Sequence, residues 1–200
     1  MQKLTLDQLA IGRAKAFQNA ADLIEDVDLL FRQRRWARVV FLSQIAIEEL
    51  GKYLMIIGAI GQVLKNQMDW QSFWKRFKKH TEKTGNILTF DAFLSPFISD
   101  EDTLEKWQRV QRDEVELEKR KLSSLYVDFQ SNQFVLPMDI IDEKLAKQAV
   151  NNAKAVFKFF AYGEEVFCKG DITNLTPEKC ADVEKKLNNL LSEAGIPNVF

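Results

Sequence analysis

The chain has 200 residues, of which 46% are hydrophobic and 28% are charged. These proportions are typical of one globular domain with a hydrophobic core, and they exclude an intrinsically disordered chain. The formal net charge is −1, so the overall charge does not attract nucleic acid, and any contact with RNA would need a local basic patch.

The cysteines and the N-terminus bear on the cellular compartment. Cys168 and Cys180 lack metal-ligand spacing and fit a reduced cytosolic protein better than a disulfide-stabilised one. The first residues lack the apolar stretch of a signal peptide. The run from Val39 to Ile60 is long enough for a membrane span, but three charged residues at its centre argue against one. We therefore expect a cytoplasmic protein without a membrane segment.

The first predicted element is a helix that begins at Thr5 or Asp7, either of which can cap it, and ends near Gln33. Its apolar residues recur at helical spacing, which indicates that one face packs against the rest of the chain. Charged residues lie on its later turns and also on its early turns, Arg13 among them. We expect this polar face to be solvated.

The second predicted helix runs from about Arg34 to Leu64 and is apolar on nearly every face, as is typical of a buried central helix. Glu48, Glu49 and Lys52 lie in its middle, where charged groups are costly unless they are paired. Glu48 and Lys52 have the i, i+4 spacing of a helical ion pair. Gly51 would let another backbone or a ligand come close. The sequence leaves open whether this cluster is a structural ion network or a functional site.

A third predicted helix is capped by Asp69, and its aromatic residues keep helical phase from Trp70 to Phe77. The residues on its other face are basic, and together with the basic residues that follow the helix they form the most basic segment of the chain. A solvated amphipathic face is the simpler interpretation. An RNA-facing surface is the sharper one, because aromatic side chains beside a basic groove suit single-stranded nucleic acid. The candidate RNA-binding residues, here and later in the chain, are Arg76, Lys79, Lys83 and Lys121.

His80 is the only histidine, and histidine is the side chain whose ordinary pKa lies near neutrality. A lone histidine is more often structural or exposed than catalytic. With no second histidine and no cysteine cluster in the sequence, we expect no metal site. No phosphate-binding loop or dinucleotide motif occurs in the sequence, so no cofactor is expected.

The middle of the chain is harder to assign. Ile87 to Ser99 is predicted to be an irregular hydrophobic segment, and a helix is expected to begin at Asp100 or Asp102 and to run into a stretch of alternating charges. Leu125 to Val127 favour an extended or loop conformation. Asn132 to Pro137 is then a loop or a short extended piece.

The end of the charged stretch supplies basic partners for the buried carboxylates. Arg120 or Lys121 is expected to lie within ion-pair distance of Glu48 or Glu49, because buried carboxylates need compensation. On this prediction Arg120→Ala lowers stability as well as activity.

A long helix capped by Asp139 or Asp142 is predicted to end at Gly170, and a last helix to run from Thr176 to Ala194. The elements together predict a single all-α domain over residues 1–200. It has a helical core of about residues 7–165, built round a central buried helix, and an additional C-terminal helical extension of about residues 171–200.

Two motifs in this order resemble a known family. The run from Ala46 to Lys52, Ala-Ile-Glu-Glu-Leu-Gly-Lys, is similar to the signature of AbiV-type phage abortive-infection proteins. The segment from Arg120 to Asp128 is similar to their second block, and His80 with Lys83 falls between, where that family tends to carry a His and Lys pair. The resemblance covers about residues 7–165.

The family is placed in the higher-eukaryote-and-prokaryote nucleotide-binding (HEPN) superfamily. The resemblance implies a HEPN-like all-α bundle, frequent homodimers and often metal-independent RNA cleavage. It further implies phage defence with arrested translation and a phage-encoded activator. The aromatic-rich stretch from Trp70 to Phe97 also favours a homodimer, because an exposed apolar surface usually marks an interface.

The chain departs from the usual catalytic pattern of the superfamily, which is Arg, four to six residues, then His, because no histidine follows Arg120. Metal-free RNA cleavage needs a base for the 2′-hydroxyl and a positive group that stabilises the phosphorane. The charge would come from Arg120, Lys121 or Lys52. The base would be His80 or one of the carboxylates, which are Glu48, Glu49 and Asp128. The candidate catalytic residues are Arg120, His80, Glu48, Glu49, Lys52, Tyr126 and Asp128.

Three functions remain open from the sequence. The first is an effector that cuts or occludes RNA after a phage protein triggers it, with Leu122 to Pro137 as the moving segment. The second is a non-enzymatic inhibitor that arrests translation through protein contacts and whose polar cluster is structural. The third is a nucleotide-binding or nucleotide-transferring module without a phosphate loop.

Overall fold

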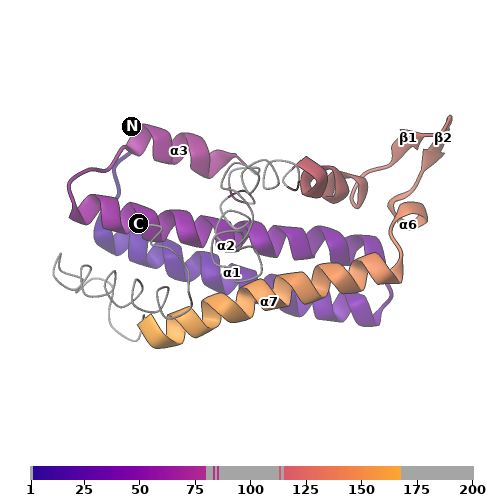
Figure 1. Cartoon of the computed structure of the whole chain (residues 1–200), viewed down its shortest axis with the longest axis horizontal. Coiled ribbons are helices and arrows are strands. Elements are labelled where there is room, and N and C mark those ends of the chain that lie inside the picture. Colours follow the sequence, from indigo (N-terminus) through magenta and orange to yellow (C-terminus); the bar gives the residue numbers. More distant parts are fainter. Residues whose placement is uncertain (1, 80–82, 84, 86–112, 114, 168–200) are drawn as a thin grey trace, which may run out of the picture.

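The computed structural model describes residues 2–79, 83, 85, 113 and 115–167. Three long helices lie side by side and form the body of the bundle (Figure 1). The elements in chain order are α1 (Leu6–Arg32), α2 (Trp36–Leu64), α3 (Trp70–Lys78), β1 (Asp128–Gln130), β2 (Gln133–Val135), α6 (Pro137–Ile140) and α7 (Glu143–Phe167). The all-α prediction is confirmed. None of the helices in the described ranges is long and apolar enough to cross a membrane.

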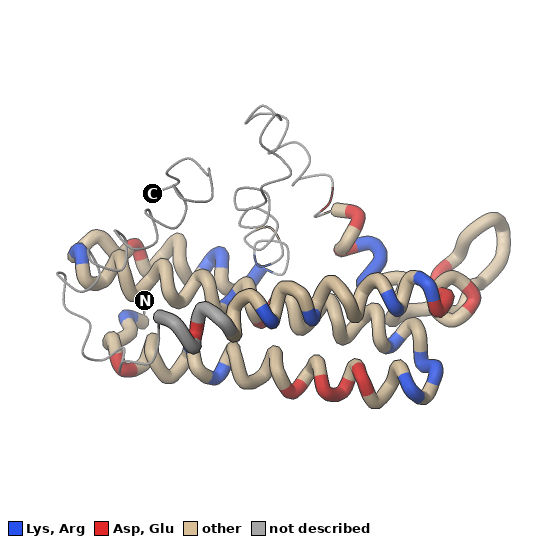
Figure 2. Tube along the Cα trace, turned by 60° about the horizontal axis from the view of Figure 1, so that its bottom comes forward, with Lys and Arg blue, Asp and Glu red and all other residues tan. Residues whose placement is uncertain are grey.

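α1 begins and ends as the sequence predicts. The Thr5 hydroxyl accepts a hydrogen bond from the backbone N–H of Gln8, and the Gln8 side chain accepts one from the backbone N–H of Thr5. This reciprocal capping box satisfies two N–H groups that the helix itself cannot pair. Gln33 closes the other end. Figure 2 shows acidic residues on the later turns of α1 and basic residues at its junction with α2.

α2 is the central helix, as predicted, and it packs against both α1 and α7. It begins at Trp36 rather than near Arg34. The reason is that Arg34 has φ of 57°, in the left-handed region, so it cannot continue or begin a right-handed helix. Buried side chains occur on all faces of α2, including Val39, Leu50 and Ala59. A helix buried on all sides fixes the position of any polar group it carries.

α3 packs its aromatic residues toward the bundle. Asp69 caps it, as predicted, by accepting hydrogen bonds from the backbone N–H groups of Gln71 and Ser72 at 2.9 and 3.1 Å. Phe73 is buried, and its ring contacts those of Trp70, Trp74 and Phe77. The aromatic stripe is therefore part of the hydrophobic core in the described part of the chain.

A short β-hairpin lies in the region after residue 127, and its second strand corresponds to the short extended piece that was one of the two alternatives predicted for Asn132 to Pro137. β1 and β2 pair antiparallel, with Phe129 opposite Phe134. Ser131 and Asn132 have φ of 50° and 65°, the positive values that a tight two-residue hairpin turn of the type I′ class needs at both central positions. The sequence prediction missed the hairpin because Ser-Asn is a weaker signal of this turn than Asn-Gly.

α7 completes the bundle. Asp142 is its cap, since the carboxylate accepts a hydrogen bond from the backbone N–H of Leu145 at 2.8 Å. The predicted helix from Thr176 to Ala194, the predicted end at Gly170 and the segment from Ile87 to Asp102 lie outside the described residues.

Candidate functional site

A buried ion cluster connects the middle of α2 to the helical segment 115–123. The Lys121 ammonium lies 2.7 Å from the Glu48 carboxylate and 2.6 Å from that of Glu118. Glu48 is 2% exposed and Lys121 is 4% exposed. The predicted pairing of a basic residue at 120 or 121 with a carboxylate of α2 is therefore confirmed, with Lys121 and Glu48 as the partners.

The charge of Lys121 is stabilised by this environment. Burial on its own would lower the pKa of Lys121, but hydrogen bonds to Glu118 and Glu48 outweigh burial and raise this pKa above 10.5. The Lys121 ammonium is therefore held in its charged form between two carboxylates. An ammonium paired in this way holds two helices together. The two adjacent carboxylates offset its attraction for a negatively charged substrate.

The second pair in the cluster differs from the predicted one. Lys52 forms its ion pair with Glu49, at i, i+3, and the predicted i, i+4 pair with Glu48 is replaced by the bond from Glu48 to Lys121. Both spacings place side chains on neighbouring parts of a helix surface. Glu48 turns toward the helical segment 115–123 because a buried partner is available there.

Gly51 allows a second chain segment to contact α2 beside these pairs. A Cβ at Gly51 would overlap the backbone carbonyl of Lys83, so only glycine leaves room for that backbone. The side chain of Lys83 is buried, and burial, with repulsion by Lys52 as the second cause, lowers the pKa of Lys83. The predicted close approach at Gly51 is thus confirmed, and its partner is the backbone of this chain.

Arg120 lies apart from the buried carboxylates. Its side chain is 40% exposed, and its described ion pair is a long one of 3.8 Å to Glu116. Consecutive helical residues point about 100° apart, so Lys121 and Arg120 face different surroundings. A substrate can therefore reach Arg120, which also lines the pocket described below.

Tyr126 and Asp128 do not join the cluster. Tyr126 is exposed, and Asp128 lies on β1 at the hairpin end of the molecule (Figure 1). A hydrogen bond from Gln130 and another from the backbone N–H of Phe129 lower the pKa of the Asp128 carboxyl. The described contacts of Asp128 are therefore local to the hairpin.

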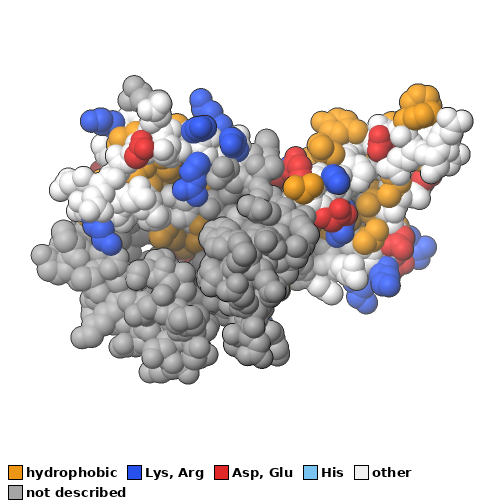
Figure 3. Space-filling model, turned by 45° about the horizontal axis from the view of Figure 1, so that its top comes forward, with side chains coloured by type: hydrophobic (Ala, Val, Ile, Leu, Met, Phe, Trp, Pro, Cys, Tyr) orange, Lys and Arg blue, Asp and Glu red, His pale blue; other side chains and the backbone are white. Residues whose placement is uncertain are grey.

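The predicted RNA-binding residues divide into exposed and buried ones. Arg76 and Lys79 are exposed, and Figure 3 shows Lys and Arg side chains gathered over α3. Lys83 and Lys121 are buried, so in this arrangement they belong to the interior rather than to an RNA-facing surface. His80 lies outside the described residues. Within the described ranges, no three His, Cys, Asp or Glu residues are grouped as a metal site requires.

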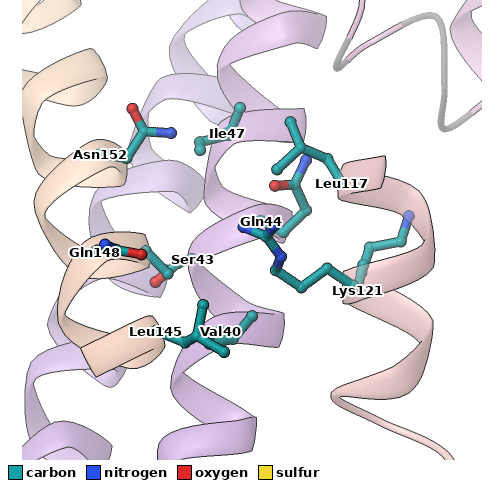
Figure 4. Close-up of a pocket in the computed structure, with 11 residues that line it drawn as sticks. Val40, Ser43, Gln44, Ile47, Leu117, Lys121, Leu145, Gln148 and Asn152 are labelled. Atoms are coloured by element: carbon teal, nitrogen blue, oxygen red, sulfur yellow. The ribbon is translucent and has the colours of Figure 1, made fainter. Parts of the chain in front are cut away.

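A polar pocket of about 160 Å³ lies next to the ion cluster, between α2, α7 and the helical segment 115–123 (Figure 4). The sequence analysis named Arg120 and Lys121 of this pocket but missed its other polar residues, Ser43, Gln44, Gln148 and Asn152, because these come from separate helices and belong to neither motif. Its lining residues are Val40, Ser43, Gln44, Ile47, Leu117, Arg120, Lys121, Leu145, Gln148, Ala149 and Asn152. Ser43 is buried, and its hydroxyl has no hydrogen-bond partner within the described structure.

A second, partly buried ion pair was also missed. The guanidinium of Arg13 pairs with the carboxylate of Glu164, which also accepts a hydrogen bond from the Tyr53 hydroxyl. The guanidinium lies 5.7 Å from the centre of the Tyr53 ring. The prediction of a solvated Arg13 is therefore wrong. Its spacing from Leu9, Ala16 and Ala20 on the buried stripe of α1 was the available signal.

A match to a protein-family model assigns the chain to a family. The family model for AbiV, a HEPN group, matches residues 8–158. The matched range includes the ion cluster, the polar pocket and the hairpin. Neither the curated proteins nor the solved structures contain a match to this chain.

Proposed function

The chain belongs to the AbiV family, a membership that implies abortive-infection defence against phage, and from this premise we propose that it arrests translation by acting on RNA once a phage protein has triggered it. The observation that carries the proposal is the position of Arg120. This cation is accessible and weakly paired, and it lines a polar pocket next to a rigid buried cluster.

Arg120 has the chemistry that RNA requires. A guanidinium binds a phosphate through two parallel hydrogen bonds, and it stabilises the negative charge that develops when a phosphodiester is attacked. The Glu48–Lys121 pair fixes the helical segment that carries Arg120 against α2. In this proposal the pair positions Arg120 and does not itself touch RNA.

The phage protein is proposed to dock on the segment from Leu122 to Met138. This segment exposes an unusual number of large apolar side chains for its length, and Phe134 is 79% exposed. Contiguous exposed apolar residues typically mark protein interaction sites. The exposed residues are Leu122, Tyr126, Val127, Phe129, Phe134, Leu136 and Met138. A partner bound here would act on Arg120 through the same short segment.

One observation favours the alternative of a non-enzymatic inhibitor. Glu48 and Glu49 are both buried and each is ion-paired, so neither carboxylate is placed to take a proton from a 2′-hydroxyl. If no other base is supplied, for example by His80 of a second chain in a homodimer, the protein would occupy RNA or a protein partner without cutting.

We expect Arg120→Ala to abolish protection against phage without loss of fold. The reason is that the substitution removes the accessible cation but leaves the buried pairs intact. The matched control is Lys119→Ala, which removes an exposed cation one residue away. Plaque counts and survival of infected cells, with thermal melts of the purified variants, measure both effects. Full protection by Arg120→Ala at normal protein levels would contradict the proposal.

A further inference from the structure

The pocket between α2, α7 and the helical segment 115–123 has a polar composition that the ion cluster does not explain. It presents the side-chain amides of Gln44, Gln148 and Asn152 together with the hydroxyl of Ser43. In Figure 4 the α7 side chains face those of α2 across the pocket. Each amide carries both hydrogen-bond donors and an acceptor. Such a set suits a neutral ligand that has donors and acceptors along one edge.

Ser43 offers a ligand in the pocket a buried hydrogen-bonding group. Its side chain is 1% exposed, and its hydroxyl oxygen has no hydrogen-bond partner in the part of the chain that the structure describes. Buried polar groups in native proteins are almost always hydrogen-bonded. A serine hydroxyl in a helix can bond to the carbonyl one turn earlier, but this one does not. A ligand atom in the pocket would provide the bond.

The charge and volume of the pocket limit the chemical class and the size of the ligand that it can bind. Lys121 is balanced by two carboxylates, so Arg120 is the cation left to meet a negative group. Val40 and Leu145 supply apolar surface that can cover the face of a flat ring. A cavity of about 150 Å³ accommodates one benzene-sized ring. The pocket volume of about 160 Å³ therefore matches a single six-membered ring better than a fused pair.

We propose that this pocket binds one unpaired pyrimidine base, with the phosphate attached to its sugar held by Arg120. Amide side chains hydrogen-bond to the edge of the base, and apolar side chains cover its faces, as in other sites that take a base out of a strand. The base is supplied by an RNA strand or by a free nucleotide. Its supply by RNA rests on the proposed function. The pocket would then select which single-stranded positions the protein engages.

Adjacent asparagines in α7 provide a matched test. Both are exposed, but Asn152 lines the pocket and Asn151 does not. The full chain is titrated with labelled oligo(U), oligo(C) and oligo(A) single strands, and separately with UMP, CMP and AMP. We expect pyrimidine ligands to bind more tightly than purine ligands. Asn152→Ala should weaken pyrimidine binding roughly tenfold, whereas Asn151→Ala should leave it unchanged. Ser43→Ala should weaken binding without lowering the melting temperature.

The arms of the experiment separate the possible failures. RNA binding that is equal in the wild type and Asn152→Ala, or that prefers purines, overturns the pocket proposal and leaves the proposed function standing. Pyrimidine mononucleotides that bind in an Asn152-dependent way, without RNA binding, support the pocket and overturn RNA as its source. No binding of any of these ligands overturns the pocket proposal, and the Arg120 infection assay then decides the proposed function separately.

Discussion

Lys121→Met is expected to lower the free energy of unfolding by about 3–5 kcal/mol, because it removes the buried ammonium that pairs with the Glu48 carboxylate. The substitution keeps the apolar length of the side chain and removes only the ammonium. Chemical denaturation of the wild type and the variant measures the difference. This is the largest single-residue effect on stability that we expect in the described structure.

The neighbouring residue is the control for this prediction. Arg120→Met removes a cation whose side chain is 40% exposed and whose pair with Glu116 is long, so the expected loss is at most about 1 kcal/mol. The sequence predicted that loss of Arg120 lowers stability. The structure places the buried ion pair at Lys121, so the large loss is now expected for that residue. Equal losses for the two variants would contradict the assignment of the buried pair to Lys121.

The pH dependence of stability gives a second check on Lys121. Because the folded-state pKa of Lys121 is raised above 10.5, its stabilisation is fully present below 10.5 and is lost as the pH rises through the folded value. The stability difference between the wild type and Lys121→Met should therefore shrink in strongly alkaline solution. A difference that stays constant there would argue against the ion pair as its origin.

Gly51→Ala is expected to destabilise the protein by about 1–3 kcal/mol, although alanine is the better helix former. The added Cβ would overlap the backbone carbonyl of Lys83, and a backbone cannot move aside as a flexible side chain can. The segment that carries Lys83 would be forced away from α2. Denaturant unfolding of the variant measures the loss.

Gly58 provides the comparison within the same helix. A Cβ at Gly58 has no atom within 4 Å, so Gly58→Ala should stabilise the protein by about 0.5–1 kcal/mol through helix propensity alone. The two substitutions are chemically identical and are predicted to have opposite signs. If Gly51→Ala were also stabilising, the contact between α2 and the backbone of Lys83 would not exist in solution.

The helices could be predicted from the sequence because their signals are local. Thr5 with Gln8, Asp69 and the unbroken apolar pattern of α2 each act within a few residues of chain. The need to compensate Glu48 was also predictable, since burial follows from the pattern and a carboxylate inside a core requires a cation. The choice of Lys121 over Arg120 was not, because it depends on the rotation of one helix against another.

The pocket and the Arg13–Glu164 pair could not be predicted from local sequence patterns, because residues far apart in the chain form them. Ser43 and Asn152 are unremarkable in their own helices, and they become a site only when α2 and α7 lie side by side. Arg13 and Glu164 are 151 residues apart in the chain. Their pairing is set by the packing of α1 against the end of α7. Sites assembled from separate helices carry no sequence spacing by which to recognise them.

The proposal that a triggered protein acts on RNA through Arg120 is tested most directly by the state of the RNA itself. Purified protein is incubated with total cellular RNA, with or without extract from phage-infected cells as the source of the trigger. We expect defined RNA fragments only with the infected extract. They should persist with Lys119→Ala and form at least about 100-fold more slowly with Arg120→Ala. Intact, unbound RNA under conditions in which the protein still arrests translation would contradict an action on RNA.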